Sequence, residues 1–357
     1  MGIKSNRTIA SYFNRFGESG TLAPRPYVGD IAVTHHGSPY ISVYPFTSGT
    51  GFGTKYSDPT TLPTDKGFGV DFSPDGTDLA VAHFGSPYIS VYSWTLGTGF
   101  GSKYSNPSTL PTNKTRDVAF SPDGTDLAVA HYTSPYVTAY PWSSGFGTKY
   151  ANPSTLPPNT AYGLVFSPDG ADLAVAHTGS PYLAVYPWSS GFGTKYSDPS
   201  TLPTDESLQP AFSPDGADIV YAHYGSPYVT AYPWTSGTGF GTKYANPSTL
   251  PAGICRGVAF SPDGADIALP HDSSPYISVY SWSSGFGTKY SDPSTLPTGN
   301  SMGVAFSPDG TDLAVVHNTS PYIAVYPWSS GFGTKYSDPS TLPGTSRADR
   351  VAFSPAV

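Results

Sequence analysis

A repeat of 46 or 48 residues covers most of this chain and constrains what it can fold into. The period can be measured on one histidine, which has the same place in seven units: His35, His83, His131, His177, His223, His271 and His317. Successive members are 48, 48, 46, 46, 48 and 46 residues apart. The longer units carry an additional Gly-Thr before Gly-Phe-Gly. Such a period indicates a ring or an array of similar units.

Each unit holds four short strand-like runs separated by Gly- and Pro-rich turns. In one unit these runs cover residues 118–121, 126–131, 136–142 and 146–150. The Ser-Pro-Asp-Gly between the first two runs suits a type I turn, with Pro at the second position. Helical periodicity is absent from the repeats. Four short antiparallel strands per unit are typical of a β-propeller blade, so we predict an all-β fold.

The two ends of the repeat array complement each other. The first repeat starts at its second strand, residues 30–35, and the last stops after its first strand, residues 351–354. We predict that these segments pair and close a ring of seven four-stranded blades, because closure removes free sheet edges. The predicted domains are therefore a propeller over residues 30–357 and an N-terminal arm over residues 1–29.

Composition and charge exclude several classes of function. The formal net charge of −8 and the pI near 5.3 argue against nucleic acid as a partner. No stretch approaches 18 apolar residues and residues 1–20 lack a signal-peptide core, so we expect neither membrane insertion nor signal-directed secretion. Cys255 is the only cysteine, which excludes an intrachain disulfide. Because no phosphate-binding loop, Gly-x-Ser-x-Gly or His-Glu-x-x-His occurs, we expect no cofactor and no catalytic residues.

The Val-Ala-Phe-Ser-Pro-Asp-Gly run, followed by Leu-Ala-Val-Ala, resembles the WD-repeat propeller family over residues 30–355. The resemblance implies a scaffold that assembles partners. The sequence departs from the family pattern in two places: Pro-Trp or Ser-Trp replaces Trp-Asp, and the Gly-His pair before the first strand is absent. The whole unit, including Gly-Phe-Gly-Thr-Lys-Tyr, is also similar to repeats in tailed-bacteriophage proteins. That second resemblance implies a virion component of the tail or capsid surface.

Residues that recur in every unit are interpreted as structural. The seven histidines would lie about 10 Å apart on a ring of about 12 Å radius, too far apart to share a metal ion. We expect each to be hydrogen-bonded at a strand end, with a collective response near pH 6.5 as the alternative. One position of the repeat is aromatic in all seven units: Phe46, Trp94, Trp142, Trp188, Trp234, Trp282 and Trp328. We expect these side chains to pack between blades, with an exposed sugar-stacking platform as the alternative. The Asp-Gly-Thr-Asp spacing offers too few oxygens for Ca²⁺.

Variation between repeats gathers in two segments, the connection into the first strand and the two residues after the repeated histidine. In an up-and-down blade both segments emerge on one face, which we predict to be a binding surface, with neutral drift of solvent loops as the alternative. The candidate binding residues are Phe68, Phe84, Arg116, Tyr132, Tyr162, Tyr224, Arg256, Met302 and Arg347.

The N-terminal arm carries a short amphipathic pattern. Ile9, Tyr12, Phe13 and Phe16 have the spacing of one helix face, between a start signal at residues 5–8 and a stop at Gly17. A helix this short is marginal alone, so it should fold only against another surface. We expect it to dock onto other proteins of a larger assembly, with packing on its own ring as the alternative.

The sequence therefore favours a non-enzymatic structural or attachment propeller. Its expected location is a phage virion, where the variable face would meet a partner, host glycan or host protein. A free lectin-like glycan binder is the alternative. A hydrolase or lyase that uses the central channel is a third possibility, since some propellers are enzymes.

Overall fold

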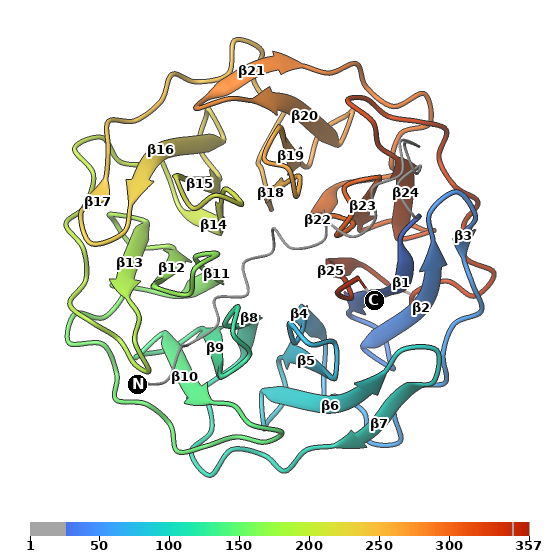
Figure 1. Ribbon diagram of the computed structural model, residues 1–357, viewed down its shortest axis with the longest axis horizontal. Helices are drawn as coiled ribbons and strands as arrows, with labels where there is room; N and C mark the ends of the chain where they lie inside the picture. Colours follow the sequence, from blue (N-terminus) through green and yellow to red (C-terminus); the bar gives the residue numbers. More distant parts are fainter. Residues whose placement is uncertain (1–25, 345, 357) are drawn as a thin grey trace, which may run out of the picture.

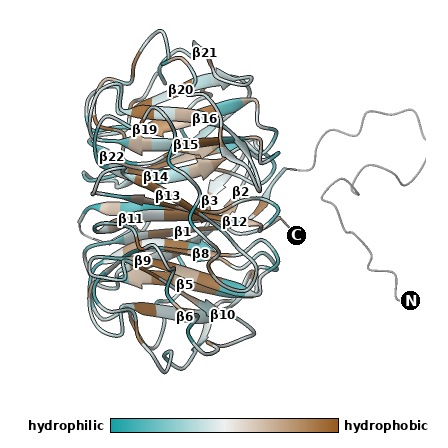
Figure 2. Cartoon of the chain, turned by 90° about the vertical axis from the view of Figure 1, so that its left-hand side faces the viewer, coloured by the Kyte–Doolittle hydropathy of each residue, from teal (hydrophilic) through white to brown (hydrophobic). Residues whose placement is uncertain are grey.

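The computed structural model describes residues 26–344 and 346–356, which form a closed ring of seven antiparallel sheets (Figure 1). Viewed edge-on, the ring is a disc whose apolar segments lie along the strands (Figure 2). The predicted seven-bladed propeller is confirmed. The amphipathic pattern at Ile9, Tyr12, Phe13 and Phe16 lies outside the described residues, and Val28 and Gly29 of the expected arm belong to the first strand.

The blades are numbered here in chain order. Blade 1 contains β25 (Ala348–Phe353), β1 (Val28–His35), β2 (Ile41–Thr47) and β3 (Gly51–Phe52). Blade 2 contains β4 (Gly67–Phe72), β5 (Asp78–His83), β6 (Ile89–Thr95) and β7 (Gly99–Lys103). Blade 3 contains β8 (Thr115–Phe120), β9 (Asp126–His131) and β10 (Val137–Pro141), and blade 4 contains β11 (Ala161–Phe166), β12 (Asp172–His177) and β13 (Leu183–Pro187).

The second half of the ring follows the same plan. Blade 5 contains β14 (Ser207–Phe212), β15 (Asp218–His223), β16 (Val229–Thr235) and β17 (Gly239–Phe240). Blade 6 contains β18 (Ala259–Phe260), β19 (Asp266–Pro270), β20 (Ile277–Trp282) and β21 (Phe286–Lys289). Blade 7 contains β22 (Ser301–Phe306), β23 (Asp312–His317) and β24 (Ile323–Pro327).

The ring closes as the sequence predicts. β25 pairs with β1 in antiparallel register, with Val351 opposite Val33. Beyond the strand, Ser354 Oγ accepts a hydrogen bond from the Asp30 N–H at 3.0 Å, and the Tyr27 hydroxyl donates to the Ser354 carbonyl at 2.9 Å. Paired backbone and buried polar contacts thus join the two ends of the chain, so β1 is paired on both sides and is not left as a free edge.

The outer strands differ from the prediction. Residues 146–150 were expected to form a fourth strand, but blade 3 has only a bridge between Trp142 and Phe146. Pro141 explains this, because it has no N–H to donate toward the outer strand. Ser93 and Ser281 replace this proline in blades 2 and 6, and only there does the fourth strand reach five and four residues.

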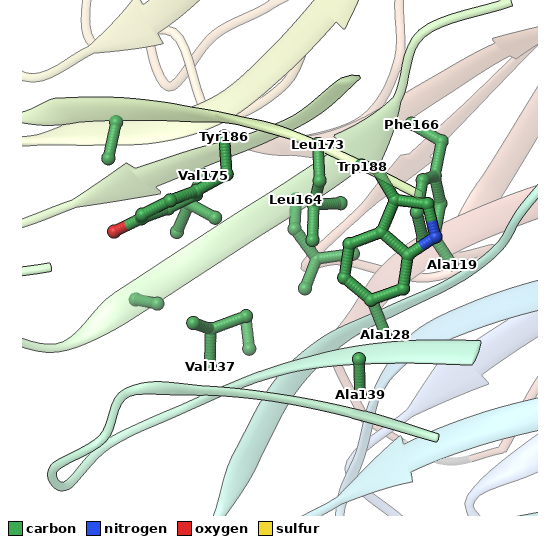
Figure 3. Close-up of a cluster of buried hydrophobic side chains, with 13 residues drawn as sticks. Ala119, Ala128, Val137, Ala139, Leu164, Phe166, Leu173, Val175, Tyr186 and Trp188 are labelled. Carbon is green, nitrogen blue, oxygen red and sulfur yellow. The ribbon is translucent and has the colours of Figure 1, made fainter. Parts of the chain in front are cut away.

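The hydrophobic core lies between neighbouring blades. Trp188 is buried against Ala119, Ala128 and Leu173, which come from the blade before its own and from its own blade (Figure 3). Its indole N–H donates to Asp126 Oδ2 at 2.9 Å. The same Trp-to-Asp bond recurs at Trp94, Trp142, Trp234, Trp282 and Trp328. The predicted inter-blade packing is confirmed, and the exposed stacking platform is excluded.

The repeated histidines are buried at the ends of the second strands. His131 Nε2, for example, lies 2.9 Å from Thr138 Oγ1, and His35 Nδ1 lies 2.7 Å from the Gly37 carbonyl. Burial lowers the pKa of six of them to about 4 and also lowers the pKa of His271. The folded ring therefore cannot gain charge on them near pH 6.5, and the alternative of a collective response at that pH is wrong.

Candidate functional site at the channel mouth

A bulge in the innermost strand of six blades turns one variable residue toward the channel. In blade 3, Thr115 pairs with His131 and Asp117 with Ala130, so Arg116 has no partner in the ladder. The same one-residue excess occurs at Tyr162, Leu208 and Met302. A bulge inserts a residue and re-aims side chains, here at the mouth of the central channel.

The bulge residues of six blades and Arg256, at the equivalent position of blade 6, meet in one pocket of about 140 Å³. They are Phe68, Arg116, Tyr162, Leu208, Arg256, Met302 and Asp349, and Tyr224, Arg347 and Arg350 complete the lining. Because every blade supplies at least one wall residue, the pocket exists only in the closed ring.

The pocket concentrates positive charge in an acidic protein. The four arginines found in residues 26–344 and 346–356 are Arg116, Arg256, Arg347 and Arg350, and all four line this pocket. The whole chain carries a formal net charge of −8. The four arginines outnumber Asp349, the one acidic residue of the lining, and a cleft with an excess of one sign of charge attracts ligands of the opposite sign, so the mouth suits an anion.

Aromatic rings hold Arg116 in place. Its guanidinium lies 4.5 Å from the centre of the Phe68 ring and 4.6 Å from that of Tyr162. Its Nε donates to the Tyr132 hydroxyl at 2.8 Å, and Phe84 stacks on Phe68 at 4.0 Å. Within the part of the chain that the structure describes, Arg116 belongs to no ion pair. The aromatic rings therefore orient a positive charge that no carboxylate neutralises directly.

Two further arginines offer buried donors. The Nε atoms of Arg256 and Arg350 are inaccessible to solvent and have no acceptor among the described residues. Arg256 is 3.6 Å from Asp272 through its Nη2, and Arg350 donates to the Met302 carbonyl at 2.9 Å through its Nη1. A buried donor without an acceptor costs about 1–3 kcal/mol.

Asp349 of the pocket wall forms a pair with His36, which adjoins the pocket and is not part of its lining. His36 Nε2 lies 2.6 Å from Asp349 Oδ2, and the His36 ring packs on Phe68 at 4.8 Å. Burial alone would raise the pKa of Asp349, but the hydrogen bond from His36 and the charge of Arg347 outweigh it and lower that pKa. His36 is the one histidine outside the repeat pattern, and 20% of its side chain is exposed. An ionised carboxylate that orients a partly exposed imidazole is a common arrangement for a general base.

The channel continues below the mouth as a second cavity of about 180 Å³. Arg350 lines both cavities and therefore lies between them. The lower one is walled mostly by aliphatic side chains and by Asp71. Burial raises the pKa of Asp71 to about 7, although the Phe120 N–H donates to its carboxylate.

Most of the residues predicted for the variable face meet in this pocket. The two segments do emerge together, since the Tyr132 N–H donates to the Lys114 carbonyl. Seven of the nine candidates line the pocket: Phe68, Arg116, Tyr162, Tyr224, Arg256, Met302 and Arg347. Phe84 and Tyr132 stand behind them and contact Arg116.

The prediction missed Leu208, Asp349 and Arg350 in the pocket, His36 beside Asp349, and Asp117 and Gln209 in the channel below. A signal for three of them is present in the sequence. Asp117, Gln209 and Arg350 follow the bulge directly, where the other four blades have glycine: Gly69, Gly163, Gly257 and Gly303. Residues that break the repeat on the innermost strand thus mark the site better than loop variability does.

Comparison with known proteins identifies the fold. The sequence matches no protein-family model and no curated protein. The structure is similar to a candidate 6-phosphogluconolactonase from Bacteroides fragilis, with a TM-score of 0.70 and 14% sequence identity over 92% of this chain and 98% of that one. It is also similar to a candidate 6-phosphogluconolactonase from Bacteroides uniformis, with a TM-score of 0.67 and 16% identity over 91% of this chain and 99% of that one. It is also similar to the periplasmic gluconolactonase of Pseudomonas aeruginosa, with 0.66 and 17% over 92% and 100%. At these identities the likeness shows the fold alone.

These neighbours correct the functional expectations. The similarity to WD-repeat and phage proteins does not extend beyond the propeller fold, because the neighbours are lactonase-like propellers. The prediction of a non-enzymatic attachment protein is therefore wrong, and nothing supports a virion location. No helix long and apolar enough to cross a membrane occurs in the described part of the chain.

Proposed function

We propose that this propeller hydrolyses lactones of anionic sugars in the pocket at the channel mouth. The observation that carries the proposal is the convergence of Arg116, Arg256, Arg347 and Arg350 on one pocket of an otherwise acidic protein. The similarity to propellers named as gluconolactonases and candidate 6-phosphogluconolactonases supports a lactone as the reacting group.

The pocket wall has two kinds of side chain that suit such a ligand. Arg256 and Arg350 supply guanidinium groups to the wall, where a phosphate or carboxylate would pair with them. Tyr162, Leu208 and Met302 line the rest of the wall, where the apolar face of a sugar ring would pack. A dry cavity of about 150 Å³ holds a benzene molecule, so the 140 Å³ found here suits a six-membered ring whose substituents reach the solvent.

His36 is the proposed general base. Asp349 fixes the imidazole through Nε2, which leaves the other ring nitrogen to take a proton from water. The water oxygen then bonds to the lactone carbonyl carbon, and the guanidinium groups stabilise the negative charge that forms on the carbonyl oxygen. The bond from that carbon to the ring oxygen breaks, and the departing oxygen takes the proton back from His36. The product is the open-chain sugar acid.

Proton release during hydrolysis of a phosphorylated aldonolactone, followed in a pH-stat, tests this proposal. The wild-type protein is expected to exceed the spontaneous rate. His36→Asn should lower kcat by about 10²-fold because it removes the base, whereas Arg256→Gln should raise KM by about tenfold because it removes a charged donor.

Lys149→Gln is the matched control, because Lys149 lies in the outer part of blade 3 and bonds only to the chain beside it. It should leave both kinetic constants unchanged. A wild-type protein that is no faster than the buffer overturns the proposed function, and so does a His36→Asn variant with full activity.

A further inference from the structure

We infer that Asp117, Gln209 and Arg350 form a cross-channel triad that positions Arg350 as an anion-binding donor at the floor of the mouth pocket. This inference rests on the proposed function in one respect, namely that the ligand is anionic. It adds two residues, Asp117 and Gln209, that lie outside the mouth pocket lining and act through Arg350.

The triad joins three blades that are far apart in the chain. Arg350 of blade 1 donates through Nη2 to Gln209 Oε1 of blade 5 at 2.6 Å. Gln209 Nε2 donates to Asp117 Oδ2 of blade 3 at 3.1 Å. The Leu164 N–H also donates to Asp117 Oδ2, at 3.1 Å, which fixes the carboxylate. These three side chains therefore span the channel.

The direction of the bonds in the triad is fixed by chemistry. A carboxylate only accepts hydrogen bonds and a guanidinium only donates them. The amide between them must therefore turn its NH₂ toward Asp117 and its oxygen toward Arg350. Reversing the amide would place a donor against the donor of Arg350 and an acceptor against the acceptor of Asp117.

Glycines in the neighbouring blades leave room for the triad. A Cβ on Gly163 would lie 2.5 Å from Gln209 Oε1, and one on Gly69 would lie 2.6 Å from the Asp117 Cα. Both separations are shorter than van der Waals contact, so a side chain at either place would displace the triad. The glycines and the three polar residues occupy equivalent positions in their blades, and together they make one layer of the channel.

The triad leaves part of the Arg350 guanidinium free for a ligand. Nη1 donates to the Met302 carbonyl at 2.9 Å, and one of the two N–H groups of Nη2 donates to Gln209. The second N–H of Nη2 has no acceptor among the residues described, whereas Nε is inaccessible to solvent. Because both terminal nitrogens are held, the guanidinium cannot rotate away from the pocket, and a bound oxyanion does not have to restrict that motion.

Titration calorimetry with inorganic phosphate as the probe tests the inference on the full-length protein. Q209L leaves the charge unchanged and removes both amide bonds, so phosphate should bind about tenfold or more weakly. D117N should also weaken binding, because the new amide lets Gln209 reverse. If only local charge mattered, D117N would instead strengthen binding by removing a negative charge.

The double variant D117N/Q209E provides the decisive comparison. It keeps the wild-type charge. With its oxygen turned to the Leu164 N–H, the new amide at position 117 would donate through its NH₂ to the new carboxylate at position 209, and that carboxylate would accept from Arg350, so the order of donor and acceptor is restored. Phosphate affinity should return to within about threefold of the wild type, while both single variants remain weak. Thermal melting of each variant shows whether it is folded.

Two outcomes overturn the inference: D117N and Q209L bind phosphate as tightly as the wild type, or the folded double variant stays as weak as the single ones. Lactone turnover is read separately. If the wild-type protein binds phosphate through the triad but does not hydrolyse a lactone, the proposed function fails while the triad stands. If the wild-type protein hydrolyses the lactone and the triad variants bind phosphate as tightly as the wild type, the triad fails while the proposed function stands.

Discussion

His35 and His36 are adjacent in the chain but differ in burial and in role. His35 is buried like its six equivalents and is hydrogen-bonded to Ser42 and Gly37, whereas His36 is partly exposed and lies beside Asp349 of the mouth pocket. The repeat pattern separates the two, because a residue that recurs in every blade serves the blade. Only the second histidine is free of that constraint.

The buried histidines should make the ring sensitive to acid. Their pKa is about 4 in the folded ring and 6.5 ordinarily, so the unfolded chain binds more protons between these values. The free energy of unfolding should therefore be largest above about pH 6.5 and fall steadily below it. Urea denaturation at several pH values measures this. His131→Gln should flatten the slope by about one proton, and a stability that is constant from pH 7 to pH 5 would contradict the burial of these rings.

At the scale of strands, the sequence predicted the regular parts of the blade and missed its irregular ones. The second strand, residues 126–131, agrees with β9 because it is buried on both faces and its apolar residues are continuous. The prediction of a fourth strand at residues 146–150 was wrong because its pairing is limited by Pro141. This proline lies on the neighbouring strand and not in the segment itself. The bulges could not be predicted either, since a bulge is defined by pairing between two strands.

The closing strand β25 should be needed for a monomeric ring. Ending the chain after Arg350 leaves Asp349 and Arg350 in the sequence but removes most of the residues that pair with Ile31 and Val33 of β1. The exposed β1 edge should associate with other copies, and the melting temperature should fall. Size-exclusion chromatography and thermal melting follow both effects. A synthetic peptide of residues 348–357 should reverse them, and a monomeric truncated chain with unchanged melting would show that closure does not depend on this strand.

At the scale of the whole molecule, the site belongs to the ring and to no single repeat. Arg350 and Gln209 are 141 positions apart in the chain, and Gln209 and Asp117 are 92 apart. The closed seven-blade ring predicted from the sequence implies that the variable residues gather on one face, and most of them do. Which of them face each other across the channel depends on bulges and on side-chain bonds between distant blades, so Asp349, Arg350 and Gln209 became visible only in the structure.

The central claim is that the arginine-lined mouth is an anion site. The most direct measurement is anomalous diffraction from crystals of the full-length protein soaked in tungstate, an oxyanion whose heavy atom can be located without bias. The strongest peak should lie in the mouth pocket within hydrogen-bonding distance of Arg256 and Arg350. An empty mouth, or tungstate bound only along the outer lysines such as Lys149, would contradict the account.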